Sequence, residues 1–140
     1  MQQRDAGHRS VPHTADARIE AWAPTRERCV AEAVAAMVDG FADLSGAPPA
    51  GTVEFRVGPS ADADLLVSTL DRVILLMDTE GQLPAEADVR AADGGLDVHL
   101  RMAGPDRIET FGAVPKAVSL HELRFDGGAL GWSCAVTLDV

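Results

Sequence analysis

The spacing of apolar residues changes in a definite order along this 140-residue chain, and that order constrains the fold more than any other feature. Residues 17–21 alternate small or apolar side chains with polar ones, which is typical of a half-buried strand. A helix pattern follows Pro24, with Thr25 as the expected N-cap. We expect this helix to stop within residues 45–49, where serine, glycine and proline gather. Its apolar stripe consists of Val30, Val34, Met37, Val38, Phe41 and Leu44.

The rest of the sequence predicts one more strand and helix, followed by two hairpins. The second helix has Ser60 or Asp62 as its expected cap and Gly81 just after its end. Asp-Gly-Gly occurs at residues 93–95 and 126–128, and glycine accepts the positive φ that tight hairpin turns need. The stripe of this helix consists of Leu66, Leu70, Val73, Ile74 and Met77. The expected strands cover residues 17–22, 52–57, 88–92, 96–102, 117–125 and 130–138.

This order of elements favours the α+β class. We expect a two-layer sandwich in which two amphipathic helices pack on one face of a largely antiparallel sheet that ends in two hairpins. The first residues are polar, so a flexible N-terminal arm is expected over residues 1–10, followed by a single domain over residues 11–140.

The composition is that of a soluble globular protein and excludes membrane and secreted classes. Apolar residues make up 46% of the chain and charged residues 24%. The longest aliphatic run, Val73 to Met77, is too short to span a bilayer, and the N-terminus lacks the apolar segment of a signal peptide. A cytoplasmic location is therefore expected. Cys29 and Cys134 fall in apolar elements and are expected to be buried thiols.

Acidic residues outnumber basic ones, and this balance bears on partners. The chain has 22 Asp and Glu against 12 Lys and Arg, a net charge of −10. Phosphate backbones attract basic surfaces, so no direct binding to nucleic acid is expected. The charge permits a basic protein partner or a bound cation. Lys116 is the single lysine among the cationic residues.

Two short segments in the first part of the chain carry side chains suited to chemistry. His13 and Asp16 precede the first strand and could bind a metal or move protons; the alternative is a turn in which Asp16 bonds to nearby backbone amides. Asp78 and Glu80 lie at the end of the second helix, against the negative end of its dipole. A solvated helix end is the alternative there.

Two more segments lie in the last part of the chain. Lys116 and His121 share a strand, where His121 could act as a ligand or proton carrier, or simply be a hydrogen-bonded sheet histidine. Asp139 and Val140 follow the last strand, where oxygens can be aimed, unless this is an ordinary exposed terminus. Phosphate loops, nucleophile triads and Cys/His metal spacings do not occur, so the residues alone reveal no enzyme active site.

Together and in this order, the four segments resemble the archease family, over residues from about 10 to the C-terminus. The sequence departs from the family where Leu120 replaces a usual aromatic residue, and where residues 69–72 replace a frequent Trp-Leu-Asn-Glu. The segments that carry the resemblance are His13-Thr14-Ala15-Asp16, Asp78-Thr79-Glu80-Gly81, Lys116-Ala117-Val118-Ser119-Leu120-His121 and Leu138-Asp139-Val140.

The resemblance implies a non-enzymatic accessory protein that activates an RtcB-type RNA ligase. Such a protein promotes guanylylation and multiple turnover of the ligase in tRNA splicing and RNA repair. The resemblance also implies a divalent cation, Ca²⁺ or Mg²⁺, bound by Asp16, Asp139 and a main-chain or terminal oxygen of Val140. All-oxygen ligands of this kind suit those cations better than zinc. The residues expected to support this site are His13, Asp78, Glu80, Lys116 and His121.

Two other functions stay open at this point. A metal-dependent hydrolase or isomerase would use His13 or His121 as a general base beside the cation. A chaperone-like interaction module would need no metal. Within the leading hypothesis, hairpin pairing should bring Lys116 beside Asp139. His121, roughly 16 Å further along its strand, should act mainly through local packing or hydrogen bonding.

Overall fold

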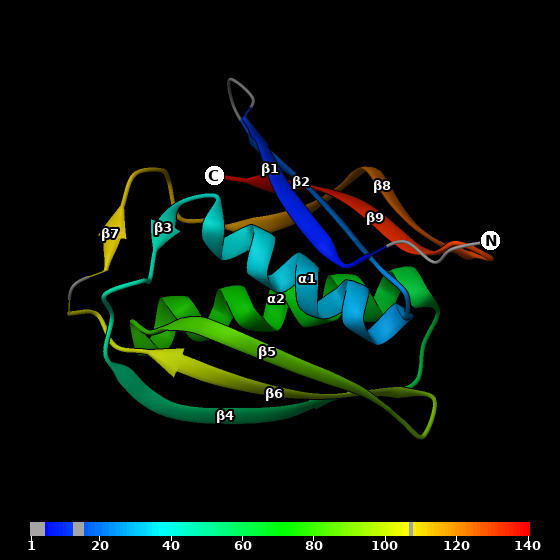
Figure 1. The fold of residues 1–140 in the computed structure, drawn as a ribbon, viewed down its shortest axis with the longest axis horizontal. Helices are drawn as coiled ribbons and strands as arrows, with labels where there is room; N and C mark the ends of the chain where they lie inside the picture. The colour runs from blue at the N-terminus through cyan, green and yellow to red at the C-terminus, as the bar shows by residue number, and fades with distance from the viewer. Residues whose placement is uncertain (1–4, 13–15, 107) are drawn as a thin grey trace.

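Two helices lie between two antiparallel sheets in the computed structural model of this chain (Figure 1), which describes residues 5–12, 16–106 and 108–140. The larger sheet has the strand order β1-β2-β9-β8, and the second has the order β4-β6-β5. A short third sheet pairs β3 with β7. The elements are β1 (Gly7–Pro12), β2 (Asp16–Ala23), α1 (Arg26–Asp39), β3 (Ala42–Asp43), β4 (Pro49–Val57), α2 (Asp62–Glu80), β5 (Leu83–Ala92), β6 (Gly95–Ala103), β7 (Glu109–Thr110), β8 (Ala117–Gly128) and β9 (Gly131–Asp139).

The α+β class and the antiparallel strands are confirmed, but the strands divide into separate sheets instead of forming one layer under both helices. The physical reason is the burial of α1. Its buried side chains cover more than half of the helix circumference, which is more than one sheet can cover. Several are alanines, which allow a second sheet to approach closely. The buried residues of α1 are Cys29, Val30, Ala31, Ala33, Val34, Ala36, Met37 and Val38.

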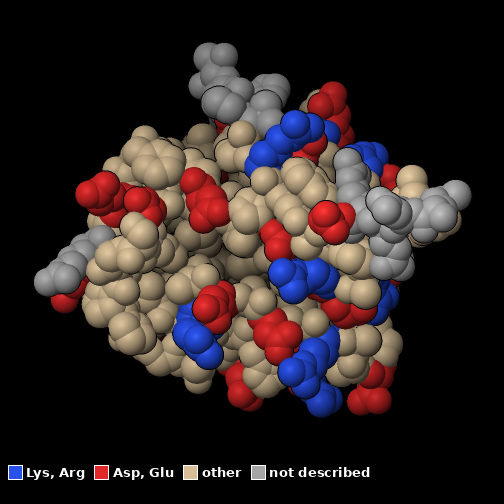
Figure 2. Space-filling model, viewed as in Figure 1, with Lys and Arg blue, Asp and Glu red and all other residues tan. Residues whose placement is uncertain are grey.

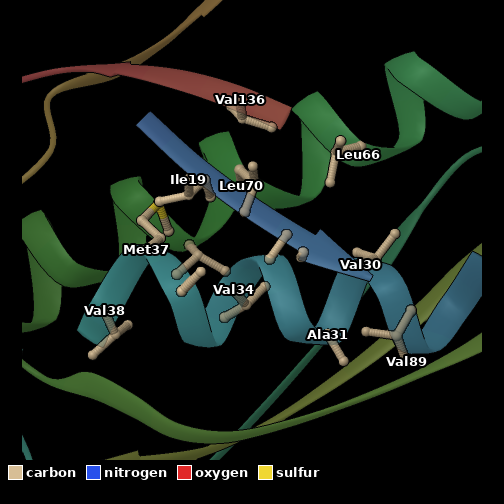
Figure 3. Packing of buried hydrophobic residues seen from close by; sticks show 14 of the residues in the cluster. Ile19, Val30, Ala31, Val34, Met37, Val38, Leu66, Leu70, Val89 and Val136 are labelled. Carbon is tan, nitrogen blue, oxygen red and sulfur yellow. The ribbon is translucent and has the colours of Figure 1, made fainter. Parts of the chain in front are cut away.

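The hydrophobic core fills the space around both helices (Figure 3). On one side of α1, Ile19 of β2, Val136 of β9 and Leu70 of α2 belong to this core. On the other side, Ala31 faces Val89 of β5. The two thiols, Cys29 and Cys134, are buried as expected.

Leucines on opposite faces of α2 provide a direct test of this core. Leu70 is fully buried, whereas Leu75 is 54% exposed. We expect Leu70→Ala to lower the free energy of unfolding by about 2–5 kcal/mol, because it removes buried apolar surface and leaves a cavity. Leu75→Ala should change it by less than about 0.5 kcal/mol. Urea denaturation of both variants measures this difference, and equal losses would contradict the assignment of the core face.

Local signals in the sequence predicted some ends of the helices correctly and others wrongly. Thr25 is the N-cap of α1 and accepts a hydrogen bond from the Arg28 amide, and Gly81 ends α2 in the left-handed conformation, both as expected. The first helix, however, stops at Asp39 and not within residues 45–49. Glycine at position 40 is costly inside a helix, and the carbonyl of the next residue, Phe41, accepts a hydrogen bond from the Phe111 amide instead.

The start of α2 and the last hairpin also differ from expectation. The N-cap of α2 is Ala61, whose methyl group cannot accept a hydrogen bond, and the Asp62 carboxylate, the expected cap, pairs with Arg26 at 2.9 Å instead. The first hairpin turns at Asp93 and Gly94, both with positive φ, as predicted. The second turns after residues 126–128, since Gly128 already pairs with Gly131. The glycine at position 127 serves another purpose, because a Cβ there would overlap the ring of Trp132.

The expected N-terminal arm is ordered in part as a strand. Residues 7–12 form β1, which pairs with β2 at the edge of the larger sheet, so the expectation of a flexible segment is wrong for residues 7–10. A histidine ties this strand to α1. The His8 Nδ1 atom lies 2.6 Å from Glu32 Oε2, and its Nε2 atom lies 2.7 Å from Asp39 Oδ2. Both carboxylates belong to α1, and Glu32 also pairs with Arg28 at 3.4 Å.

This contact makes the docking of β1 depend on pH. Burial alone would lower the pKa of His8, but the hydrogen bonds to Glu32 and Asp39 outweigh it and raise the pKa above its usual value. A raised pKa means that protonated His8 stabilises the fold below pH about 6.5, and that this contribution disappears as the pH rises through the higher folded value.

We therefore expect His8→Gln to cost on the order of 1 kcal/mol of unfolding free energy at pH 6 and clearly less at pH 9. Chemical denaturation at the two pH values measures the loss. The matched control is His121→Gln, whose side chain is 80% exposed and should leave the free energy of unfolding nearly unchanged at both. A loss for His8→Gln that does not shrink with rising pH would contradict the role of the charged ring.

Candidate functional site

Two carboxylates meet at one end of the larger sheet. Asp16 is the first residue of β2 and Asp139 the last of β9, and the two lie directly opposite each other in the antiparallel register. Directly opposite residues point to the same face, with Cβ atoms about 4.5–5.5 Å apart. Their neighbours Ala17 and Leu138 point toward the core, so the two carboxylates lie on the outward face.

This pair fits a hard divalent cation. Two carboxylates at such a spacing can offer oxygens to one Ca²⁺ or Mg²⁺ ion. Val140 follows Asp139 and adds only main-chain oxygen. Among the residues that the structure describes, no three His, Cys, Asp or Glu side chains gather closely enough to hold a metal. Main-chain oxygens and water would therefore have to complete the coordination, which is usual for Mg²⁺ and common for Ca²⁺. His13, expected to support this site, lies outside the described residues.

A third strand, β8, begins at this end of the sheet, directly after Lys116. Ala117 of β8 lies opposite Asp139 on the other side of β9, and the Lys116 amide donates to the Asp139 carbonyl at 2.7 Å. The expected position of Lys116 beside Asp139 is thus confirmed for the main chain. The ammonium makes no ion pair within 4.0 Å among the described residues, so its contact with a carboxylate remains a prediction.

The Lys116 side chain borders a groove between α2 and the segment that leads into β8. The groove has a volume of about 600 Å³, and both Asp78 and Lys116 line it. Glu80, the last residue of α2, is exposed and does not line it. The lining residues are Asp71, Ile74, Leu75, Asp78, Val114, Pro115, Lys116 and Ala117.

His121 lies apart from the carboxylate pair, on a bulge of β8. The register with β9 jumps between Ser119 and Arg124, and Glu122 inside the bulge has a φ of +56°. The His121 ring is 80% exposed, which excludes a packing role. Its amide donates to the Ser119 hydroxyl at 3.2 Å, and its Nε2 atom lies 3.6 Å from the Glu122 carboxylate.

Arg18 ties this bulge of β8 to β2 and β9. It follows Asp16 by two residues on β2 and therefore shares its outward face. Its guanidinium donates to the Thr137 hydroxyl at 2.9 Å and to the Glu122 carbonyl at 3.3 Å. Sequence reasoning missed this residue, although an arginine two positions from a candidate ligand in an alternating strand was the available signal.

The outward surface carries both signs of charge. Figure 2 shows acidic and basic side chains interspersed on one face of the molecule, with no continuous basic patch among the described residues on that face. No helix among the described residues is long and apolar enough to cross a membrane.

The fold and the site define a class of α+β protein in which the second strand, β2, pairs with the last strand, β9, and places two aspartates opposite each other. The sequence profile of the archease protein family matches residues 8–140, and the chain belongs to this family. The "Probable protein archease" of Mycobacterium tuberculosis strain H37Rv is 53% identical over 135 residues, which cover 96% of this chain and 75% of that protein. "Protein archease" of Archaeoglobus fulgidus is 27% identical, over 95% of this chain and 98% of that protein.

Two solved structures share the fold. The solution structure of Methanobacterium thermoautotrophicum protein 1598 has a TM-score of 0.76 and 23% sequence identity, covering 96% of this chain and 99% of its own. The crystal structure of a Thermotoga maritima protein called "an archease, possible chaperone" has a TM-score of 0.67 and 21% identity, covering 93% of this chain and 94% of its own. Both likenesses support the α+β fold described above.

The carboxylate pair leads to a binding prediction. We expect Asp16→Asn and Asp139→Asn each to weaken Ca²⁺ or Mg²⁺ binding at least about tenfold, because either substitution removes an anionic oxygen donor. Calorimetric titration of each ion into each variant measures the affinity. The matched control is Asp126→Asn, an aspartate of β8 that lies opposite Ser133 and away from Asp139. Equal affinities for wild type and Asp139→Asn would contradict the assignment.

Proposed function

We propose that this protein activates an RtcB-type RNA ligase, by promoting its guanylylation and multiple turnover in tRNA splicing or RNA repair, and that it catalyses no reaction itself. The observation that carries the proposal is the meeting of Asp16, Asp139 and Lys116 at one end of the larger sheet. Membership of the archease family supports it. We also propose a cytoplasmic location for this activity.

The chemistry of these residues suits binding and orientation more than catalysis. A cation held by the two aspartates would offset their charge and could accept phosphate oxygens in its open positions. Lys116, with its amide fixed on the Asp139 carbonyl, can direct an ammonium toward a nucleotide phosphate. The described residues bring no histidine or thiol beside this pair, since His121 lies on the bulge and both cysteines are buried.

The acidic surface supports a basic partner rather than free RNA. A net charge of −10 repels phosphate backbones and attracts a protein that carries basic surfaces for handling RNA. Complementary charge of this kind mainly raises the rate of encounter, and salt weakens it. The alternative, a metal-free chaperone-like module, draws on the words "possible chaperone" in the name of the T. maritima structure. Cation binding at Asp16 and Asp139 separates the two proposals.

A guanylylation assay tests the activation directly. We expect Lys116→Ala and Asp139→Asn each to lower the stimulation of ligase guanylylation at least about tenfold while the melting temperature stays within a few degrees, because both side chains are exposed. His121→Ala should keep full stimulation, since its ring lies on the bulge away from the carboxylates.

Full stimulation by Lys116→Ala would remove the lysine from the mechanism. No stimulation by the wild-type protein would overturn the proposed function as a whole. Turnover of small-molecule esters or phosphates by the purified protein alone would instead favour the hydrolase alternative.

A further inference from the structure

The groove beside Lys116 has an apolar floor that is open to solvent. Ile74 and Pro115 are buried at its base. Leu75 of α2 and Val114 of the facing segment form its walls and are 54% and 49% exposed. Leu75 lies five residues before the end of α2, so its exposure does not come from a frayed helix end. Exposed apolar side chains that face each other across a groove are typical of a contact surface.

Two aspartates border the apolar part of this groove on the α2 side. Asp71 precedes Leu75 by four residues and Asp78 follows it by three, so all three share one face of the helix. Neither carboxylate makes an ion pair within 4.0 Å among the described residues. The nearest arginine in sequence, Arg72, lies over the Phe55 ring at 5.3 Å.

A mixed apolar and charged surface continues along α2. A second hollow, with a volume of about 460 Å³, shares Asp71 and Leu75 with the first and extends to Phe55 and Val57 of β4, and Arg56 and Arg72 also line it. The two hollows together form a track along one side of the helix. A track of this length suits an extended or helical segment better than a small compact ligand.

We propose that this track binds a segment of a partner protein in which an apolar side chain is flanked by lysine or arginine. The apolar side chain enters between Leu75 and Val114, and the two cations meet Asp71 and Asp78, which are about 10 Å apart along the helix axis. Charge complementarity selects this occupant for the part of the track beside Lys116: the body carries −10, and that groove is lined by two carboxylates against one ammonium, whereas the second hollow adds Arg56 and Arg72. A second copy of this chain would bring the same negative charge and is disfavoured.

The track lies at the same end of the molecule as the carboxylate pair, so a partner bound in the track would lie near that pair. Lys116 borders the groove with its side chain, while its amide bonds to Asp139. A partner seated against Leu75 is therefore held at the same end of the molecule as the carboxylate pair. This inference rests on the proposed function, since the ligase is the partner expected to carry the segment.

Binding of the purified ligase to three leucine or valine variants tests the track. We expect Leu75→Ser and Val114→Ser each to weaken ligase binding at least about tenfold, because each removes apolar surface that the partner would bury and introduces a hydroxyl that must be desolvated. The matched control is Leu130→Ser in the β8–β9 turn, since Leu130 is 53% exposed, nearly as much as Leu75. The double substitution Asp71→Asn with Asp78→Asn should weaken binding and reduce its dependence on salt. Calorimetry gives the affinities, and thermal melting checks the fold.

Several outcomes would overturn the track. Unchanged binding by Leu75→Ser and Val114→Ser would do so, while Asp139→Asn could still lose stimulation and leave the proposed function intact. A loss by Leu130→Ser alone would place the interface at the β8–β9 turn. Self-association of the wild type that Leu75→Ser abolishes, seen by sedimentation, would make a second copy the occupant.

A peptide experiment keeps the track testable even if the ligase does not bind. The probes are two ten-residue peptides with a central Leu-Leu, one flanked by arginines and the other by glutamates. In NMR titrations, the arginine peptide should shift the amide resonances of Val114 and Lys116, and the glutamate peptide should not. Equal shifts by both peptides, or none by either, would contradict the charge argument.

Discussion

The pairing of β9 with strands on both of its sides is the constraint on which the rest of this structure depends. β9 lies between β2 and β8, and its alternation sends Val136 and Leu138 into the core while Asp139 stays on the outward face. A shift of the register by one residue would exchange these faces and expose the core side chains. The burial of the inward row therefore also fixes which residues stand opposite Asp139. The geometry of the carboxylate pair is a by-product of hydrophobic packing.

The edges of the larger sheet are protected by different means. β8 is one edge strand, and its bulge with Glu122 at positive φ interrupts the row of backbone groups that another strand could use. Arg18 bonds to the Glu122 carbonyl inside that bulge, so the interruption is held in place. β1 is the opposite edge, and His8 ties it to α1. Specific polar contacts therefore hold both edge strands of the larger sheet in place.

Much of the fold could be predicted because its signals are local. Thr25 caps a helix through the next turn, Gly81 ends one through its own φ, and the Asp93-Gly94 turn needs only its own two residues. The division into sheets could not be predicted in this way. It depends on how far α1 is buried on its second side, which is decided by strands distant in sequence. The candidate site likewise has a part that local signals predict and a part that depends on strands distant in sequence.

Asp16 and Asp139 were named from the sequence, but only pairing across the whole chain makes them neighbours. The roles of the two glycines before the last turn show the same limit, because the ring of Trp132, not the turn, requires a glycine at position 127. Leu75 was visible as an apolar residue off the buried stripe of α2. The wall that faces it comes from residues 114–117, which carry no periodic pattern before β8 begins. A groove between a regular and an irregular segment therefore escapes pattern reasoning.

The strand order also has a consequence for how this molecule is made. β2 and β9 come from opposite ends of the sequence, so their contact closes the longest loop in the fold. Closing a long loop lowers the entropy of the chain, and such contacts tend to form late. The helices and the β4-β6-β5 sheet lie between these strands in sequence and can form from nearer contacts. Topology therefore predicts that the two aspartates come together late in folding. A chain in which β2 and β9 had not yet paired would lack the paired carboxylates, so such a molecule could not engage a partner through this site.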